Sequence, residues 1–327
     1  MSANIDKYHQ FEDVVQLIKQ AKGTALRLVN TTLIDLYWNI GEYVSIKTAN
    51  DGWGKSTVTE LSKYINSKDP NIDGFSDKNI WRMKQFYETY IGDTKLSPLV
   101  REINWTNNLI IFSRSKSEEE REFYLRHCIM EHYSKRELER QISASLFERT
   151  MLTDTKLSPV LREIHPDAAN CFRDSYTFEF LGKPNIENEK ELRKGLVKQM
   201  KEFILELGKN FLFIGEEYRV QVGNGDFYID LLFYHRGLQC LVAFELKDDK
   251  FKPEFIGKLD FYLEALDRDV KKANENPSIG VLLCKDKDNE VVEYALSRSL
   301  SPTMVAEYKM QLPDKKILQQ KLHELSE

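Results

Sequence analysis

Three charged side chains interrupt two apolar stretches in the second half of the chain. Asp230 divides the apolar run of residues 227–234, and Glu245 and Lys247 lie at the end of the run of residues 238–246. A turn containing His-Arg-Gly separates the two runs, which are therefore predicted to form a β-hairpin. Charged groups are costly to bury without partners, so their presence inside strands indicates a site where they act together.

The alternation of side chains along strands predicts that these three charges share one face. A two-residue loop at Arg236-Gly237 sets the register of the hairpin. That register pairs Phe227 with Leu246, Ile229 with Phe244, Leu231 with Val242, and Asp230 with Ala243. One face is then wholly apolar, whereas a shift by one residue would mix apolar and charged positions. Glu245 becomes the diagonal neighbour of Asp230, and Lys247 follows on the same face.

The predicted cluster has two interpretations, which differ in whether it holds a metal ion. A structural ion pair between Lys247 and a carboxylate gains little in a core, because desolvation offsets most of the Coulomb attraction. Two carboxylates beside one lysine also leave an excess negative charge. Carboxylate oxygens, a backbone carbonyl and water are the ligands that Mg²⁺ prefers. Metal binding by Asp230 and Glu245 is therefore favoured over the bare ion pair.

The elements around this hairpin predict an α+β domain. The expected elements are a helix over 189–207, strands over 211–222, 227–234 and 238–246, a helix over about 253–266, a strand over 278–284, a helix over 290–299 and a last strand over 304–308. The order αβββαβ predicts a mixed sheet flanked by helices. Proline and glycine punctuate the segment before it, which predicts a linker over 166–187 and a second domain over 188–327.

The first part of the chain, residues 1–165, is predicted to be a helical N-terminal domain. Apolar residues recur at helical spacing over 11–44, and Ser56, Ser76, Ser117 and Ser134 can cap later helices. Two short helices joined by a polar turn are compatible with a helix-turn-helix and equally with any small helical bundle. DNA binding, protein binding and self-association into a homo-oligomer therefore all stay open for this domain.

A short repeat lies within the helical part. DTKLSPLVREI at 93–103 recurs as DTKLSPVLREI at 154–164. Each copy has Ser-Pro before an apolar and charged stretch, so both are predicted to form the same turn and the same helix start. A docking motif is the less favoured alternative.

Composition excludes several classes of protein. Of the 327 residues, 41% are hydrophobic and 30% are charged, which is typical of a globular protein. No apolar run approaches the ~18 residues of a membrane span, and the N-terminus lacks a signal-peptide core, so a cytoplasmic protein without a membrane partner is expected. The cysteines are widely spaced, which argues against a zinc ribbon or a disulfide framework. With a net charge of −5, binding to nucleic acid must depend on a local basic patch.

Asp230 together with Glu245-Leu246-Lys247 resembles the D…(D/E)xK signature of the PD-(D/E)XK phosphodiesterases, whose core has the same αβββαβ order. The stretches GDFYIDLLFYH, FELK, KFKPEFIGKLDFYL, NPSIGVLLC and VEYAL resemble the bacterial YhcG-like nucleases. The helical half, through WNIGEY and GWGKSTVTELSKYI, is similar to the N-terminal domain of those proteins. The likeness thus covers nearly the whole chain. The ExK stretch alone is a weak motif. The upstream aspartate, the placement of the three charged side chains on one face of the hairpin, and the following helix make the combination specific.

The resemblance implies roles for the central residues of the hairpin. Asp230 and Glu245 would bind a divalent ion, with the Leu246 carbonyl as third ligand. The ion would be Mg²⁺, with Mn²⁺ as a substitute. Lys247 would orient or activate the attacking water and offset phosphate charge.

The resemblance also points to helices on either side of the hairpin. Lys258 and Tyr262 share a helix face, where related nucleases often carry Gln-x-x-x-Tyr. A cation beside the scissile phosphate and a solvated helix face are equally open for Lys258. Glu191 matches the place of an auxiliary acidic residue on the first helix of the domain, with Glu187 and Glu189 close by.

These residues together imply a metal-dependent nuclease, most simply an endonuclease acting on DNA in DNA repair or in defence against foreign DNA. The alternative is a catalytically silent nucleic-acid- or protein-binding module that keeps the nuclease fold. An intact Asp/Glu/Lys set speaks against that alternative, because a site without chemistry has no physical reason to keep buried charges. A purely structural assembly protein built on the helical half is a third interpretation. Metal-dependent cleavage distinguishes the first from the others.

Overall fold

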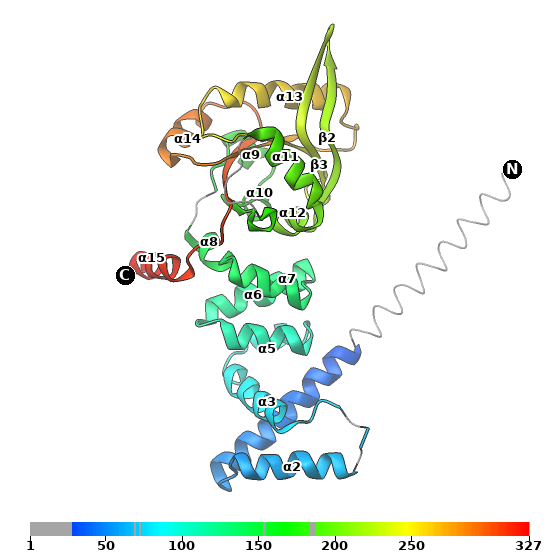
Figure 1. Cartoon of the computed structure of the whole chain (residues 1–327), viewed down its shortest axis with the longest axis vertical. Helices are drawn as coiled ribbons and strands as arrows, with labels where there is room; N and C mark the ends of the chain where they lie inside the picture. Colours follow the sequence, from blue (N-terminus) through cyan, green and yellow to red (C-terminus); the bar gives the residue numbers. More distant parts are fainter. Residues whose placement is uncertain (1–27, 69, 72, 153–154, 183–187, 327) are drawn as a thin grey trace, which may run out of the picture. The chain divides into compact units, whose positions relative to one another are not determined.

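The computed structural model describes residues 28–68, 70–71, 73–152, 155–182 and 188–326 (Figure 1). Two compact units divide the chain, the first ending at Glu139 and the second beginning at Arg140. The predicted helical pattern over 11–27, and Glu187, lie outside the described residues. No helix within the described ranges has both the length and the apolar character that crossing a membrane requires.

The described part of the first unit is helical, as predicted. Residues 28–50 are helical. They are followed by α2 (Lys55–Lys68), α3 (Asp77–Tyr90), α4 (Leu96–Leu99), α5 (Trp105–Arg114), α6 (Glu118–Glu131) and α7 (Lys135–Ser143), which crosses the division between the units. Ser76 caps α3 by accepting a hydrogen bond from the Asn79 N–H, and Ser117 caps α6 in the same way. These two helices therefore begin at capping serines, where the sequence predicts it.

Close contact between helices explains one glycine of the WNIGEY stretch. A Cβ atom at Gly41 would lie 2.2 Å from the carbonyl oxygen of Met83 on α3. Only glycine allows the two backbones to approach this closely. The helix of residues 28–50 thus packs directly on α3, around a small core that contains Tyr37, Phe75 and Met83.

The second unit contains a six-stranded mixed sheet with helices on both faces. Its elements are α8 (Leu146–Leu152), α9 (Pro159–Ile164), α10 (Ala168–Cys171), β1 (Ser175–Thr177), the short 3₁₀ helix η1 (Glu179–Leu181), α11 (Glu189–Lys198), α12 (Met200–Leu207), β2 (Phe211–Val222), β3 (Gly225–His235), β4 (Cys240–Leu246), α13 (Phe255–Asp269), β5 (Ile279–Cys284), α14 (Asn289–Leu296), β6 (Thr303–Lys309) and α15 (Lys315–Ser326). From α11 to β6 this order confirms the predicted α+β fold with an αβββαβ core.

Strand order in the sheet is β1-β6-β5-β4-β3-β2. The β2–β3 and β3–β4 pairs are antiparallel, whereas β4–β5, β5–β6 and β1–β6 are parallel. Parallel neighbours need a crossover, and α13 and α14 supply the two that join β4, β5 and β6. The closed end of the β2–β3 hairpin reaches beyond α13 in Figure 1.

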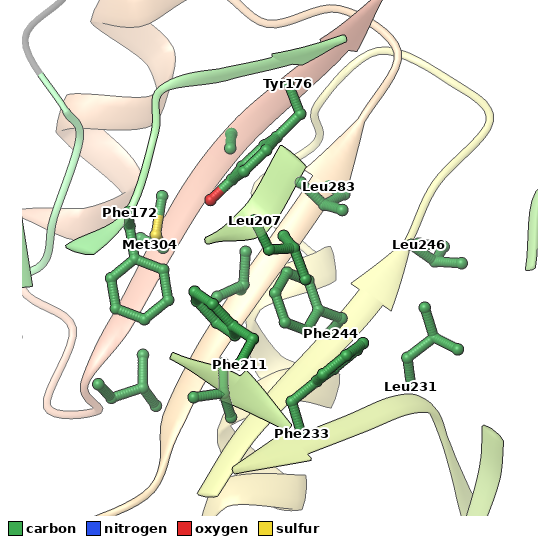
Figure 2. Packing of buried hydrophobic residues seen from close by; sticks show 14 of the residues in the cluster. Phe172, Tyr176, Leu207, Phe211, Leu231, Phe233, Phe244, Leu246, Leu283 and Met304 are labelled. Carbon is green, nitrogen blue, oxygen red and sulfur yellow. The ribbon is translucent and has the colours of Figure 1, made fainter. Parts of the chain in front are cut away.

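Two buried clusters cover the two faces of this sheet. On one face Phe233 and Phe244 pack against Phe203 of α12, in the cluster shown in Figure 2. On the other face Leu232 and Ala243 belong to a cluster with residues of α13 and α14. Because both faces are covered, every residue of β4 and β5 is buried. Charged residues in β4 are therefore held in a rigid, water-poor position.

The β3–β4 hairpin differs from the predicted register. Leu231 pairs with Phe244 and His235 with Cys240, so the loop contains the four residues 236–239 rather than two. This moves the pairing by two residues, which keeps the hairpin parity. The predicted pairing of Ile229 with Phe244 is wrong, because the β3–β4 pairs end at Leu231 while β3 continues along β2. Ile229 instead belongs to the cluster beneath α13.

The predicted linker over 166–187 is wrong for its described residues. α10 and β1 lie within it, and β1 is a strand of the sheet, with Tyr176 opposite Tyr308 of β6. Tyr176 and Phe178 are fully buried in the core. A three-residue strand has no readable alternation, and its partner is at the far end of the unit, so the local pattern could not reveal it. The compact units divide earlier, before residue 165.

The two copies of the repeat adopt different structures, so the prediction of one shared turn is wrong. In the first copy Asp93 accepts hydrogen bonds from the N–H groups of Lys95 and Leu96, and α4 begins at Leu96. In the second copy Ser158 caps α9 and its Oγ also accepts from the Thr303 N–H of β6. Contact with the sheet thus overrides the local sequence in the second copy.

Candidate active site

The structure brings Asp230, Glu245 and Lys247 together, as the alternation of side chains along the hairpin predicts. The Lys247 Nζ lies 3.0 Å from Glu245 Oε1. The Leu246 N–H donates to Asp230 Oδ2 over 3.0 Å. One step beyond the last β3–β4 pair, Asp230 lies opposite Glu245 rather than opposite Ala243, which Leu232 occupies. All three side chains are buried.

The main chain of β4 fixes where these groups point. The Lys247 N–H donates to the Leu283 carbonyl of β5, which continues the sheet to the end of the ExK stretch. Leu246 points into the core cluster between them. Alternation along the strand therefore turns Glu245 and Lys247 to the same side.

Helix α13 places Lys258 and Tyr262 at the same site. The Lys258 Nζ donates to Glu245 Oε1 over 2.5 Å, while its side chain stays 48% exposed. The Tyr262 hydroxyl donates to the Tyr228 carbonyl of β3 over 2.7 Å. Lys258 is therefore not on a purely solvated helix face, and Tyr262 joins α13 to the strand that carries Asp230.

Helix α11 contributes Glu189 and Arg193. Glu189 Oε1 lies 3.0 Å from the Lys247 Nζ, so this helix presents an acidic side chain to Lys247. Glu191, the residue expected from the resemblance, lies in the first turn of α11, where its N–H donates to the side chain of the capping residue Asn188. Arg193 lies 2.8 Å from Asp230 Oδ1.

Sequence reasoning missed Arg193 and its second partner, Glu217 of β2, at 2.6 Å. A usable signal was present, because Glu189 and Arg193 are spaced i,i+4 and must share a helix face. Glu217 had no such signal, since exposed acidic residues are common on edge strands.

Burial and charge act against each other in this cluster. Burial and the nearby Asp230 raise the pKa of Glu245, while Lys258 and Lys247 oppose that rise. For Lys247, burial lowers the pKa, but Glu245 and Glu189 outweigh it and the net shift is upward. Lys258 behaves in the same way, with Glu245 as its main partner. The two lysines therefore stay charged, and Glu245 gains from any further cation.

The donor atoms fit a hard divalent cation. Glu245 Oε2 is buried and has no hydrogen-bond partner among the described residues. Each Asp230 oxygen accepts one hydrogen bond and keeps a lone pair for a metal. The described residues contain no group of three or more His, Cys, Asp or Glu side chains placed to hold a metal. The Leu246 carbonyl and water would therefore complete an oxygen-only set, which suits Mg²⁺.

Comparison with known proteins covers both units. Residues 169–323 match the family model described as "YhcG PDDEXK nuclease domain", and residues 13–149 match "DUF1016 N-terminal domain". A curated Escherichia coli (strain K12) protein named "Putative nuclease YhcG" is 29% identical over 357 residues, covering 96% of this chain and 93% of that protein.

Similarity to solved structures is partial. A repair endonuclease from Pyrococcus abyssi aligns with a TM-score of 0.27 at 14% identity, covering 40% of this chain and 50% of that one. An EndoMS–dsDNA2 complex aligns with a TM-score of 0.23 at 17% identity, covering 36% of this chain and 45% of that one. This chain thus spans about half the length of each of those structures.

Proposed function

Because this chain belongs to the YhcG-like nucleases of the PD-(D/E)XK superfamily, we propose that it is a metal-dependent endonuclease that hydrolyses phosphodiester bonds in DNA. The observation that carries this proposal is the buried pair of Asp230 and Glu245, with one carboxylate oxygen that no described protein group satisfies. A buried, unpaired carboxylate oxygen is costly unless the site takes up a cation.

The ion and the residues divide the chemistry between them. A divalent ion held by Asp230, Glu245 and the Leu246 carbonyl would polarise the phosphoryl group and make bound water a better nucleophile. Lys247 carries three N–H donors, and its contacts to Glu245 and Glu189 use two of them. The third donor can orient a water or a phosphate oxygen. Because the Lys247 side chain is buried, solvent water screens its interaction with a phosphate oxygen only little.

Lys258 is suited to meet the phosphate itself. Its ammonium contacts Glu245 while about half of its side chain remains exposed. A cation in this position can stabilise the negative charge that develops during phosphoryl transfer. Glu189 and Tyr262 act indirectly, by holding Lys247 and the β3 main chain.

DNA contacts are proposed for the first unit, where α3 presents exposed basic residues. Lys78 and Arg82 are exposed and lie one helical turn apart. Lys84, on the same helix, contacts Glu88 at 2.6 Å. Two cations on one helix face can contact phosphates along a backbone. We propose that such an enzyme acts in DNA repair or in defence against foreign DNA.

A panel of substrates and metals tests the proposal. Full-length protein is incubated with duplex, single-stranded and branched DNA and with RNA, in Mg²⁺, Mn²⁺ or EDTA. We expect cleavage of DNA in Mg²⁺ and Mn²⁺, and none in EDTA. Glu245→Gln should abolish cleavage, whereas Glu264→Gln, which alters an exposed glutamate of α13 paired with Arg268, should not. DNA binding without cleavage in any metal would favour the silent binding module instead.

A further inference from the structure

Arg193 of α11 lies between two carboxylates at the edge of the site. Its Nη1 is 2.8 Å from Asp230 Oδ1, and its Nη2 is 2.6 Å from Glu217 Oε1. The side chains of Arg193 and Asp230 are only 10% and 11% exposed, whereas that of Glu217 is 60% exposed. The guanidinium therefore bridges a buried carboxylate of the site and an accessible carboxylate outside it.

Glu217 has an unusual backbone conformation at this point. The β2–β3 register pairs Glu216 with Leu231 and Tyr218 with Ile229, so Glu217 lies across from Asp230. Its φ of 43° is in the left-handed region, which costs a non-glycine residue on the order of 1 kcal/mol or more. Such conformations concentrate at functional sites, where surrounding contacts hold them.

The Asp230 carboxylate is held from two sides. Arg193 donates to Oδ1, and the Leu246 N–H donates to Oδ2. Rotation of the carboxylate would break at least one of these hydrogen bonds. The same face of α11 presents Glu189 to Lys247. One helix thus offers an opposite charge to each of two central side chains of the site.

We propose that Arg193 is a positioning residue for Asp230. Its guanidinium, anchored by Glu217, fixes the Asp230 carboxylate in the orientation in which a divalent cation meets it. The planar guanidinium suits this task, because its donors are fixed in one plane and hold two carboxylates in a set orientation, whereas the donors of a lysine ammonium rotate. The inference rests on the proposed metal-dependent function and adds to it the residue that prepares the ligand.

A different role would make Arg193 only a counter-charge for Asp230. Two substitutions separate the roles. Arg193→Lys keeps the charge and loses the planar fork, while Arg193→Gln removes the charge. A counter-charge predicts unchanged metal affinity in Arg193→Lys and tighter binding in Arg193→Gln, since a repelling cation is gone. Positioning predicts weaker binding in both variants.

Titration calorimetry of the full-length protein with Mn²⁺ and with Mg²⁺ measures the difference. We expect the dissociation constant to rise by about tenfold or more in both Arg193 variants, the usual effect of removing a group that orients a ligand. Lys194→Gln, at an exposed neighbouring position on α11, should bind like the wild type. Thermal unfolding in EDTA shows whether each variant is folded.

Glu217→Gln keeps the test open if an Arg193 variant does not fold, because Glu217 is exposed and its loss should not unfold the protein. We expect it to weaken metal binding less than the Arg193 changes. Wild-type affinity in folded Arg193→Lys, or tighter binding in Arg193→Gln, would overturn the positioning role while leaving the metal site intact. A wild-type protein that binds neither ion would overturn the metal-dependent function, and this inference with it.

Discussion

Glu245 is the residue at which the charges of three elements meet. Its Oε1 accepts a hydrogen bond from Lys258 of α13 and lies 3.0 Å from the Nζ of Lys247 after β4. Asp230 of β3 faces it and raises its pKa further. The charge state of Glu245 therefore depends on Asp230, Lys247 and Lys258 together. Replacing any one neighbour alters the charge that the others experience.

Asp230, Glu245 and Lys247 should therefore behave as one catalytic unit. Asp230→Asn, Glu245→Gln and Lys247→Met should each lower kcat/KM for cleavage by on the order of a hundredfold or more. Combining the three changes should cost little more than the most severe single change, because each already disables the unit. Single-turnover cleavage assays measure this. Three losses that multiply would show that the residues act independently.

The buried imidazole of His235 should contribute to the pH dependence of stability. Burial, together with His165, lowers its pKa from 6.5 to about 4, and its Nδ1 accepts a hydrogen bond from the Leu238 N–H. The unfolded chain thus binds a proton between pH 6.5 and 4 that the folded chain does not. Stability present above pH 6.5 should fall through this window, by about 3 kcal/mol for this group.

Asparagine at this position separates the effect of His235 from other titrations. His235→Asn retains an acceptor for the Leu238 N–H but does not titrate, so its stability should change less between pH 6.5 and 4. Urea unfolding at several pH values measures the two slopes. Parallel slopes for the wild type and His235→Asn would show that another group causes the loss.

Among the elements, those with strong patterns were predictable and those set by distant contacts were not. Apolar runs with clear limits predicted β5 and β6 closely. The helix expected over 189–207 is broken at Gln199 into α11 and α12, where the backbone leaves helical geometry. No glycine or proline marks that break. The same holds for the candidate active site. The alternation of side chains along the strands predicted the cluster of charged residues in the hairpin. It did not predict the contact of Arg193 with Asp230, because this contact depends on where α11 packs.

Gly280 of β5 sets how closely α13 approaches the sheet. A Cβ atom there would lie 2.7 Å from Cγ of Leu259, the residue after Lys258. Gly280→Ala should therefore push α13 outward, cost about 1–3 kcal/mol, and lower cleavage by weakening the contact between Lys258 and Glu245. Urea unfolding and kcat/KM measure the two effects.

Gly257 offers a matched control on α13 itself. An added Cβ there meets no atom within 4 Å, and alanine favours a helix over glycine by about 1 kcal/mol. Gly257→Ala should thus keep or raise stability and keep activity. If Gly280→Ala and Gly257→Ala have the same free energy of unfolding, the close approach of α13 to the sheet at Gly280 does not affect stability.

At the scale of the second unit, a buried carboxylate joins its beginning to its middle. Glu206 of α12 is fully buried and lies within 2.9 Å of Arg140, 3.1 Å of Arg149 and 3.2 Å of Arg173. Burial alone would raise the pKa of Glu206, but the arginines lower it to about 2. The carboxylate therefore stays ionised and depends on residues that precede the predicted domain boundary at 188.

Two fragments test where this unit begins. Residues 140–327 retain the arginines, β1 and the core residues Leu157, Phe172 and Phe178, and should unfold cooperatively. Residues 185–327 leave Glu206 buried without a cation, which costs about 3–5 kcal/mol, and should not fold stably. Circular dichroism during urea unfolding compares them. If the two fragments are equally stable, the result would support the boundary at residue 188 that is expected from the sequence.

For the whole protein, salt dependence tests the role of the first unit. With a net charge of −5, general attraction to DNA is weak. Replacing Lys78 and Arg82 by glutamine should lower DNA affinity and reduce the slope of log K against log salt by roughly one for each side chain. Lys84→Gln, whose ammonium contacts Glu88, should change the slope less. An unchanged slope in the double variant would assign α3 to protein contacts.

The pairing of the edge strand β1 with β6 also determines when the sheet can be completed during synthesis. β1 leaves the ribosome early in the second unit, but its partner β6 is made near the end of the chain. The β2–β3–β4 hairpins can form from nearby residues, whereas closing this edge must first overcome the entropy of a long loop. Until β6 arrives, β5 is an open edge that another chain can pair with. The nascent chain should thus be most prone to aggregation just before β6 emerges.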